Sequence, residues 1–328
     1  MRLYDLVVVG FVGGLGTTLA TPAPHVRVVV LAVLSGLTGC AAALYGADYL
    51  TRADDLVDKP HRPIPSGRLS VRTAKRASLV LAGGTLVLDL LVAWRSLVFV
   101  VLAAFAYAAY GAGLKSRGLW GDAASGFAGW TCPLLAGACF SAVWPPPALV
   151  VAALALGLQG AFSNVLLAIM DVEEDRRAGS RTLPVRRGVQ VSVGVLAVLA
   201  VAAYGLAALT PRALGRPAPT VFAVLLLGAV TVAGAVVAGA ARTRAWRVVA
   251  WHLCERVLLP AALWTLADPA VGVLLAVLAL LVVGLAPRPM LHGGPAGGAG
   301  GRALTEHPPR LSGSDASAVR PGQERSGG

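Results

Sequence analysis

Residues 27–70 read RVVVLAVLSGLTGCAAALYGADYLTRADDLVDKPHRPIPSGRLS and join an apolar run to an acidic end and a basic loop. The run at 27–50 has only two charged side chains, Arg27 and Asp48, and is long enough to cross a membrane as a helix. Its acidic end holds Asp48, Asp54, Asp55 and Asp58. Lys59-Pro60 and the prolines after it end the helix in a turn-rich loop that carries several cations. The stretch predicts a membrane helix that presents carboxylates and then cations at one membrane face.

The whole chain has the composition of a membrane protein. Hydrophobic residues make up 56% and charged residues 13%, and the mean hydropathy is +0.73. Apolar runs of spanning length predict an all-α, polytopic helix bundle of ten spans. The predicted spans are 5–21, 27–50, 77–94, 96–112, 120–142, 147–170, 189–209, 218–240, 248–267 and 269–286. Only Asp268-Pro269 separates the last two, so nine spans is an alternative count.

The basic residues are distributed unequally between the two sides of the predicted bundle. A cytoplasmic N-terminus places 23 of the 28 Lys and Arg residues in cytoplasmic segments, including the loops that follow both acidic clusters. This is the bias of the positive-inside rule, and it predicts a multi-pass cell-membrane protein whose acidic clusters face the cytoplasm. The net charge of +12 therefore reflects topology and predicts no nucleic-acid partner.

The chain divides into two predicted regions. Residues 1–286 contain all the spans and form the transmembrane domain. Residues 287–328 are rich in Gly, Pro and Ser with scattered charges, and such a composition cannot bury a core. We expect a disordered tail there.

Two acidic clusters have the spacing of metal-binding helices. Asp48 and Asp55 are seven residues apart and share a helix face with Thr51 between them. The second cluster, DVEEDRRAGSRTLPVRRG at 171–188, places Asp171 and Asp175 four apart on one face, with Asn164 about two turns earlier on the same side.

Both clusters pair acids with a following basic segment, and this order predicts a diphosphate site. Mg²⁺ prefers oxygen ligands and commonly bridges carboxylates to substrate phosphates, while Arg and Lys bind the remaining phosphate oxygens. Asp48, Asp55, Asp171 and Asp175 are the predicted Mg²⁺ ligands and catalytic residues. The alternative for either cluster alone is a set of solvated charges at the membrane edge.

The two clusters resemble the signature regions of the UbiA superfamily of intramembrane aromatic and lipid prenyltransferases. A third match is the segment from Tyr110 and Lys115 to Gly121-Asp122, which is similar to the family's Tyr- and Lys-bearing loop. The resemblance covers roughly residues 1–286. It implies a helical bundle around a central cavity, a Mg²⁺-bound isoprenyl diphosphate under the cytoplasmic loops, and transfer of the prenyl group to an acceptor.

The resulting predictions for the substrates can be stated residue by residue. The diphosphate-binding residues are Lys59, Arg62, Lys115, Arg176 and Arg181, and further substrate-binding residues are Asn164 and Tyr110. His252, Glu255 and Arg256, inside the ninth span, either line the acceptor end of the cavity or fix helix packing.

This sequence departs from the family's pattern in both motifs. The first usually reads N-D-x-x-D-x-x-x-D, and here Ala47 and Thr51 replace one Asn and one Asp. In the second, Ala168 stands where many members have a further Asp. Metal affinity at the first site is expected to be lower, because Thr51 brings an oxygen but no charge.

The predicted function is Mg²⁺-dependent transfer of an isoprenyl chain from its diphosphate to an acceptor within the membrane. The acceptor is a lipophilic or aromatic molecule: a small aromatic compound, a quinone precursor or a polar lipid. Two alternatives remain. A terpene cyclase of the same superfamily would use the same diphosphate site. A transporter or non-catalytic membrane protein would use the acidic clusters for ion passage or for topology alone. Paired broken helices in inverted repeats would favour transport, and the sequence shows none.

Overall fold

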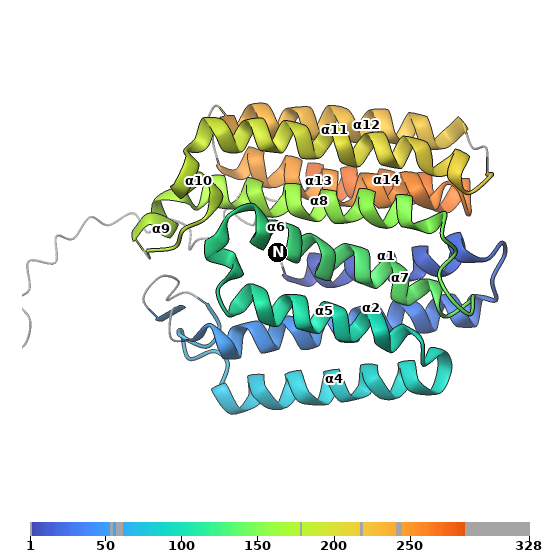
Figure 1. Ribbon diagram of the computed structural model, residues 1–328, viewed down its shortest axis with the longest axis horizontal. Helices are drawn as coiled ribbons and strands as arrows, with labels where there is room; N and C mark the ends of the chain where they lie inside the picture. The colour runs from blue at the N-terminus through green and yellow to red at the C-terminus, as the bar shows by residue number, and fades with distance from the viewer. Residues whose placement is uncertain are drawn as a thin grey trace, which may run out of the picture. The chain divides into compact units, whose positions relative to one another are not determined.

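Helices make up the fold of this chain (Figure 1). The computed structural model describes residues 2–52, 55–56, 62–177, 179–216, 219–240 and 245–285. The elements in these ranges are α1 (Arg2–Ala20), α2 (Val26–Leu50), α4 (Val71–Ala93), α5 (Ser96–Gly111), η1 (Leu114–Arg117), α6 (Leu119–Gly126), η2 (Phe127–Thr131), α7 (Cys132–Ala138), α8 (Leu149–Met170), α9 (Val172–Arg177), α10 (Leu183–Arg187), α11 (Val189–Ala213), α12 (Pro219–Ala240), α13 (Ala245–Trp264) and α14 (Pro269–Leu285). No strand occurs among the residues described, so the all-α prediction is confirmed.

The compact unit of the chain is Met1–Gly294, and Pro295–Gly328 forms a separate unit. The boundary predicted at 286/287 stays a prediction. Residues 287–328 fall outside the described residues, so the disorder expected there stays a prediction.

Each predicted span coincides with a helix or with a short series of helices. By length and composition, five helices within the described ranges can cross a membrane, in Val26–Leu50, Val71–Ala93, Leu149–Met170, Val189–Ala213 and Pro219–Val237. Tyr4–Ala20, Ser96–Gly111 and Pro269–Leu281 are shorter apolar helices. The arrangement is that of a multi-pass membrane protein, while the count of nine or ten spans remains a prediction.

The fifth predicted span is not one regular helix. It consists of α6, a π-helical turn at η2 and then α7, which has Pro133 in its first turn. Single π turns inside helices shift the side chains that follow and are frequent at functional sites. Here the turn contains Trp130, which is buried. Just before it, Gly126 lies against α8 so closely that a Cβ would be 2.1 Å from the Gly157 carbonyl oxygen.

An internal repeat relates the two halves of the helical unit. An offset of 120 residues brings α1 onto α6 and α7, α2 onto α8, α4 onto α11 and α5 onto α12. Corresponding helices run in the same direction, so the repeat is direct (Figure 1). The first members pack on each other: Thr21 Oγ1 donates to the Ser141 carbonyl at 3.0 Å, and Ser141 Oγ donates to the Thr17 carbonyl at 2.7 Å. This repeat was not predicted from the sequence.

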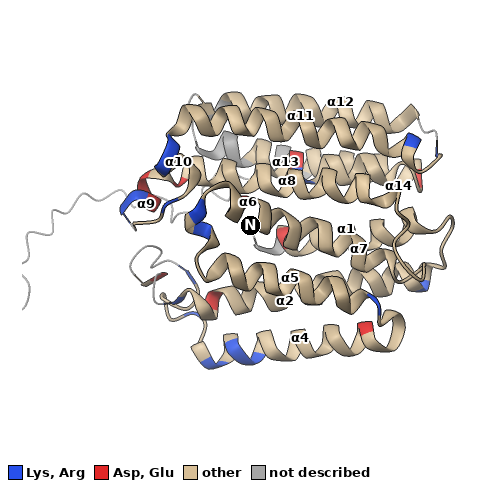
Figure 2. Cartoon of the chain, in the orientation of Figure 1, with Lys and Arg blue, Asp and Glu red and all other residues tan. Residues whose placement is uncertain are grey.

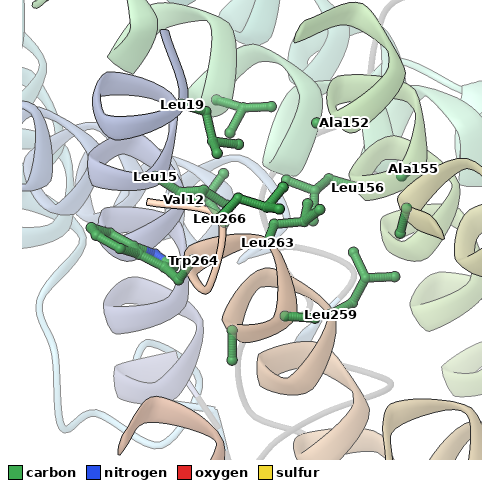
Figure 3. Packing of buried hydrophobic residues seen from close by; sticks show 14 of the residues in the cluster. Val12, Leu15, Leu19, Ala152, Ala155, Leu156, Leu259, Leu263, Trp264 and Leu266 are labelled. Carbon is green, nitrogen blue, oxygen red and sulfur yellow. The ribbon is translucent and has the colours of Figure 1, made fainter. Parts of the chain in front are cut away.

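The main hydrophobic core lies where α1, α8 and α13 meet. Leu15 from α1, Leu156 from α8, and Leu259 and Leu263 from α13 are fully buried there and point toward one another (Figure 3). Helix α13 lies beside α1, α8 and α12 and is followed by α14 after a tight turn. Asp268 caps α14, accepting bonds from the backbone N–H groups of Ala270 and Val271 at 2.9 and 3.1 Å.

Candidate diphosphate and metal site

The first acidic motif follows a bend at the end of α2. Helical geometry stops after Leu50, because Thr51 has φ −90° and ψ 6°. The backbone bonds nevertheless continue across the bend: Thr51 N–H donates to the Ala47 carbonyl at 2.9 Å, and Asp55 N–H donates to the Thr51 carbonyl at 2.9 Å. Asp48 and Asp55 are both buried, with 3% and 5% exposure. The uninterrupted helix that the spacing predicted is therefore broken at Thr51, although its hydrogen-bond ladder persists.

Asp55 is held by a hydroxyl and by a guanidinium. Thr51 Oγ1 donates to Asp55 Oδ2 at 2.9 Å. Arg62 Nη1 lies 2.8 and 2.7 Å from the two carboxylate oxygens of Asp55. Arg62 thus lies beside the acidic motif that its loop follows, and its predicted role in binding the diphosphate stays a prediction. Lys59, also predicted to bind the diphosphate, lies outside the described residues, as do Asp54 and Asp58.

The second acidic motif has the same backbone construction. Helix α8 ends at Met170, and Asp171 has φ −90° and ψ 9°. Asp171 N–H donates to the Leu167 carbonyl at 2.9 Å, and Asp175 N–H donates to the Asp171 carbonyl at 2.8 Å. Asp175 is 8% exposed and accepts a bond from Thr182 Oγ1 at 3.0 Å. Lys115 Nζ, from η1, lies 3.8 Å from its other oxygen.

The internal repeat explains the departures from the family pattern. The same offset of 120 residues relates Thr51 to Asp171, Asp55 to Asp175, and Asp48 to Ala168. Each motif therefore keeps a carboxylate four residues after the bend, Asp55 or Asp175. The second carboxylate lies before the bend in the first motif and at the bend in the second, so each motif presents a pair. The residue seven positions after the buried carboxylate also corresponds: Arg62 in the first motif and Thr182 in the second. Thr182 was not among the predicted site residues, and this spacing is the signal that could have identified it.

Three further residues connect the second motif to the helices beneath it. Asn164 Nδ2 donates to Asp122 Oδ1 at 2.6 Å, across α8 and α6. Tyr110, at the end of α5, lies beside Asn164 and within electrostatic range of Asp122 and Asp175. The structure thus brings together both predicted substrate-binding residues. Asp122 is a buried member of this group that the predicted site omitted, although the Gly121-Asp122 pair had been matched to the family loop.

Close packing requires a glycine at position 121, near the start of α6. A Cβ on Gly121 would lie 2.5 Å from the Leu114 carbonyl oxygen, so only glycine lets α6 pack this closely against η1. The contact places η1, with Lys115, over the end of α8.

The remaining predicted cations lie on the surface. Arg176 Nη1 donates to Glu173 Oε2 at 3.0 Å within α9, and both side chains are more than half exposed. Arg181 is exposed in the segment before α10. Their roles at the diphosphate stay predictions. The acidic residues at the end of α2 and in α9 lie at the same end of the helical unit, next to Lys and Arg (Figure 2).

The donor set suits a hard divalent cation. Asp48, Asp55, Asp171 and Asp175 supply only carboxylate oxygens, which Mg²⁺ prefers. In the part of the chain that the structure describes, no group of three or more His, Cys, Asp or Glu side chains could hold a metal ion. Pairs of carboxylates that need oxygen ligands from a substrate fit Mg²⁺ bound together with phosphates. Burial of Asp48, Asp55 and Asp175 argues against the alternative that these are merely solvated charges.

Comparison with known proteins identifies the class of protein to which this fold and site belong. The model of the UbiA prenyltransferase family matches residues 6–254. The chain therefore belongs to the UbiA prenyltransferase family, as the motifs predicted. It is a multi-pass integral membrane protein and a prenyltransferase.

Relatives and solved structures agree with this assignment. The chain is 29% identical over 202 residues to digeranylgeranylglyceryl phosphate synthase of Thermococcus gammatolerans, covering 61% of this chain and 72% of that one. It is 32% identical over 168 residues to the bacteriochlorophyll synthase 33 kDa chain of Cereibacter sphaeroides, covering 49% and 54%.

Two solved UbiA homologues share the fold. The apo protein from Aeropyrum pernix has a TM-score of 0.68 at 16% identity, with 81% of this chain and 98% of that one covered. The protein from Archaeoglobus fulgidus bound to GPP and Mg²⁺ has a TM-score of 0.59 at 15% identity, covering 81% and 96%.

Proposed function

We propose that this chain transfers an isoprenyl group from its diphosphate to an acceptor within the membrane, in a Mg²⁺-dependent reaction. The observation that carries the proposal is the repeated construction of the two motifs. Each has a helix bend, a buried aspartate four residues later, a hydroxyl bonded to that aspartate and a nearby cation. Such a matched pair suits a substrate group with two similar halves, and a diphosphate is such a group.

The proposed roles of the residues follow from their contacts. Asp48 and Asp55 would hold Mg²⁺ on one side of the diphosphate, and Asp171 and Asp175 on the other. The bound metal would supply neutralisation of the charge that develops on the departing diphosphate. Thr51 and Thr182 keep Asp55 and Asp175 oriented through bonds of 2.9 and 3.0 Å.

Arg62 and Lys115 would bind the diphosphate oxygens as well as orient the carboxylates. Arg62 contacts Asp55 and Lys115 contacts Asp175, so each cation already lies beside a proposed metal ligand. Arg62 is 29% and Lys115 45% exposed, which leaves donors of both free to reach a substrate. Charge-assisted bonds to phosphate are stronger than neutral ones. We assign Lys59, Arg176 and Arg181 to the same task, from segments that close over the diphosphate.

The helical interior suits the other half of the reaction. Loss of diphosphate from an allylic carbon leaves a delocalised cation, and an apolar environment protects it from water until the acceptor attacks. Asn164 and Tyr110, below the second motif, would contact the substrate on this side.

The acceptor and the orientation also belong to the proposal. We infer a small aromatic compound, a quinone precursor or a polar lipid as the acceptor. The named relatives synthesise digeranylgeranylglyceryl phosphate or bacteriochlorophyll. The excess of Lys and Arg in the loops of both motifs supports a cytoplasmic position for the site.

A reconstituted preparation tests the proposed function. The full chain in lipid vesicles is incubated with labelled isoprenyl diphosphates of several lengths, with Mg²⁺ or with EDTA, and released diphosphate and prenylated products are measured. We expect diphosphate release only with Mg²⁺, and its loss in Asp55→Asn and in Asp175→Asn.

The matched control is Asp89→Asn. Asp89 is a fully buried aspartate in α4 whose Oδ1 accepts a bond from Ser35 Oγ at 2.6 Å, far from either motif in sequence. The Asp89→Asn variant should retain activity, since an asparagine oxygen can still accept the bond from Ser35. Full activity in EDTA, or in both motif variants, would contradict the proposal.

A further inference from the structure

A second polar group lies on α13, away from both acidic motifs in the sequence. His252 and Glu255 are fully buried, and Arg256 is 9% exposed. Ser163 Oγ, from α8, donates to Glu255 Oε1 at 3.0 Å, and His252 Nδ1 lies 3.2 Å from the same oxygen. Ionisable side chains inside membrane bundles are costly and usually serve a function. The diphosphate site described above uses none of them.

Arg256 joins α13 to α1 through an aspartate that the sequence analysis did not single out. Arg256 Nη1 donates to Asp5 Oδ1. The guanidinium also lies over the ring of Trp130, 5.2 Å from its centroid, in the π turn η2. Beside this pair, the Tyr4 hydroxyl donates to the Leu253 carbonyl and fastens the start of α1 to α13. Asp5 is thus held by α13 through Arg256, and Arg256 is itself in contact with η2.

Asp5 lies near ionisable groups of three other helices: Cys40 of α2, Tyr107 of α5 and Arg256 of α13. Tyr107 lies next to Gly129 of η2, the same turn that contains Trp130, and 39% of Tyr107 is exposed.

Neighbouring polar residues connect Tyr107 with the second acidic motif. Tyr107 is within electrostatic range of Tyr110, one turn further along α5. Tyr110 in turn is within range of Asp122 and Asp175. Tyr107 and Tyr110 of α5 therefore lie between the surroundings of Asp175 and those of Asp5.

The carboxylate is the accessible member of the buried pair. The Asp5 side chain is 23% exposed and the Arg256 side chain 11% exposed. Arg256 Nε has no hydrogen-bond partner among the described residues and is not accessible, so a ligand cannot reach it. The pair accordingly presents an accessible hydrogen-bond acceptor, and such a group recognises a donor such as a hydroxyl.

We propose that Asp5, held by Arg256, binds the hydroxyl group of the acceptor and receives its proton during prenyl transfer. This inference rests on the proposed function and names the chemical class of acceptor: an alcohol or phenol. The bond between the allylic carbon and the diphosphate oxygen breaks, and the diphosphate retains the electron pair. The acceptor oxygen then bonds to the allylic carbon, and its proton passes to the carboxylate of Asp5.

Asp5 is a sufficient base for this step although Arg256 stabilises its charge. A neutral hydroxyl oxygen that bonds to a carbocation becomes strongly acidic, so a carboxylate can take the proton. Arg256 holds Asp5 in place before the acceptor arrives, and Trp130 supports the guanidinium through a cation–π contact.

Variants of the pair test the proposal in the reconstituted full chain. Labelled geranylgeranyl diphosphate is supplied with Mg²⁺ and with a panel of long-chain glycerol ethers and phenols. Transfer to the acceptor and acceptor-independent hydrolysis to prenyl alcohol are measured separately. Asp5→Asn should lower transfer by about 100-fold or more, in the range for loss of a general base, while hydrolysis is retained. Asp5→Glu should recover part of the transfer, and Asp89→Asn should behave as wild type.

The double variant Asp5→Asn with Arg256→Gln separates chemistry from folding. If the pair only fastens α1 to α13, then removal of both charges should restore much of the activity that Asp5→Asn alone loses, because no uncompensated charge remains. Our proposal expects the double variant to hydrolyse the diphosphate and still fail in transfer.

The outcomes distinguish this proposal from the proposed function. Wild-type protein that neither hydrolyses nor transfers from the diphosphate contradicts both. The role of Asp5 is overturned, while the proposed function stands, if the wild type hydrolyses and transfers and Asp5→Asn transfers normally. Recovery of transfer in the double variant has the same consequence. Loss of hydrolysis together with transfer in Asp5→Asn, in protein with an unchanged unfolding temperature, also overturns it.

Discussion

Thr51→Asp should strengthen Mg²⁺ binding at the first motif. Thr51 corresponds to Asp171 in the internal repeat, and both have the same bent backbone, with ψ of 6° and 9°. A carboxylate at position 51 would therefore leave the backbone in a conformation that Asp171 already adopts. It would also lie next to Asp55, whose Oδ2 is 2.9 Å from Thr51 Oγ1.

The size of the effect follows from the charges. An added carboxylate about 4 Å from a divalent cation gains roughly 8 kcal/mol at an effective dielectric constant of about 20. Repulsion between Asp55 and the new carboxylate is present with and without the metal and largely cancels from the binding free energy. Dehydration and lost side-chain freedom offset most of the attraction. We expect at least about 1.4 kcal/mol to remain, which corresponds to a tenfold lower Mg²⁺ concentration at half-maximal turnover.

Metal-free Thr51→Asp should in turn be less stable than wild type. It loses the Thr51 to Asp55 bond, worth about 1 kcal/mol, and adds repulsion that Arg62 only partly offsets. The assay is a Mg²⁺ titration of diphosphate release, accompanied by thermal unfolding with Mg²⁺ and with EDTA. An unchanged Mg²⁺ requirement in a folded, active variant would refute the interpretation of Thr51 as a degraded ligand position.

Three further substitutions test separate parts of the account. Arg62→Gln should raise the KM for the isoprenyl diphosphate by about 10- to 100-fold, because charge-assisted bonds are lost. The control Arg72→Gln, at an exposed position in α4, should leave the KM within about twofold of the wild-type value. Equal KM values for the two variants would count against Arg62. Thr182→Val should raise the Mg²⁺ requirement several-fold by releasing the buried carboxylate of the second motif, and an unchanged titration would remove Thr182 from the site. Gly126→Ala should lower stability by about 1–3 kcal/mol or more in thermal unfolding, because the added Cβ meets the α8 backbone. The control Gly83→Ala should be neutral or slightly stabilising, because no atom lies within 4 Å of the added Cβ. Similar unfolding temperatures for the two glycine variants would contradict the close packing of α6 on α8.

The predictions for the two acidic motifs were made from local spacing. Asp48 and Asp55 were placed on one stripe because seven residues make two helical turns, and Asp171 and Asp175 because four residues return to the same face. Arg62 follows its motif so closely that its contact with Asp55 could be expected. These predictions depended only on the helical period and on short separations along the chain.

Long-range contacts could not be predicted in the same way. Lys115 and Asp175 meet because Gly121 lets α6 pack closely on η1, and Asn164 and Asp122 meet only where α8 packs on α6. Asp5 and Arg256 are 251 residues apart, and a lone aspartate near the start of an apolar helix carries no signal of its partner. The π turn at Phe127–Thr131 was also missed, because its sequence is as apolar as the helix around it.

The measurement that tests the central claim most directly is a structure of the full chain in lipid with Mn²⁺ in place of Mg²⁺ and a non-hydrolysable isoprenyl thiolodiphosphate. The account predicts metal density on both sides of one diphosphate group, bound by Asp48 and Asp55 on one side and by Asp171 and Asp175 on the other. Arg62 and Lys115 should contact its oxygens. A diphosphate bound elsewhere, or acidic pairs that face away from each other with no metal shared through the diphosphate, would contradict the account.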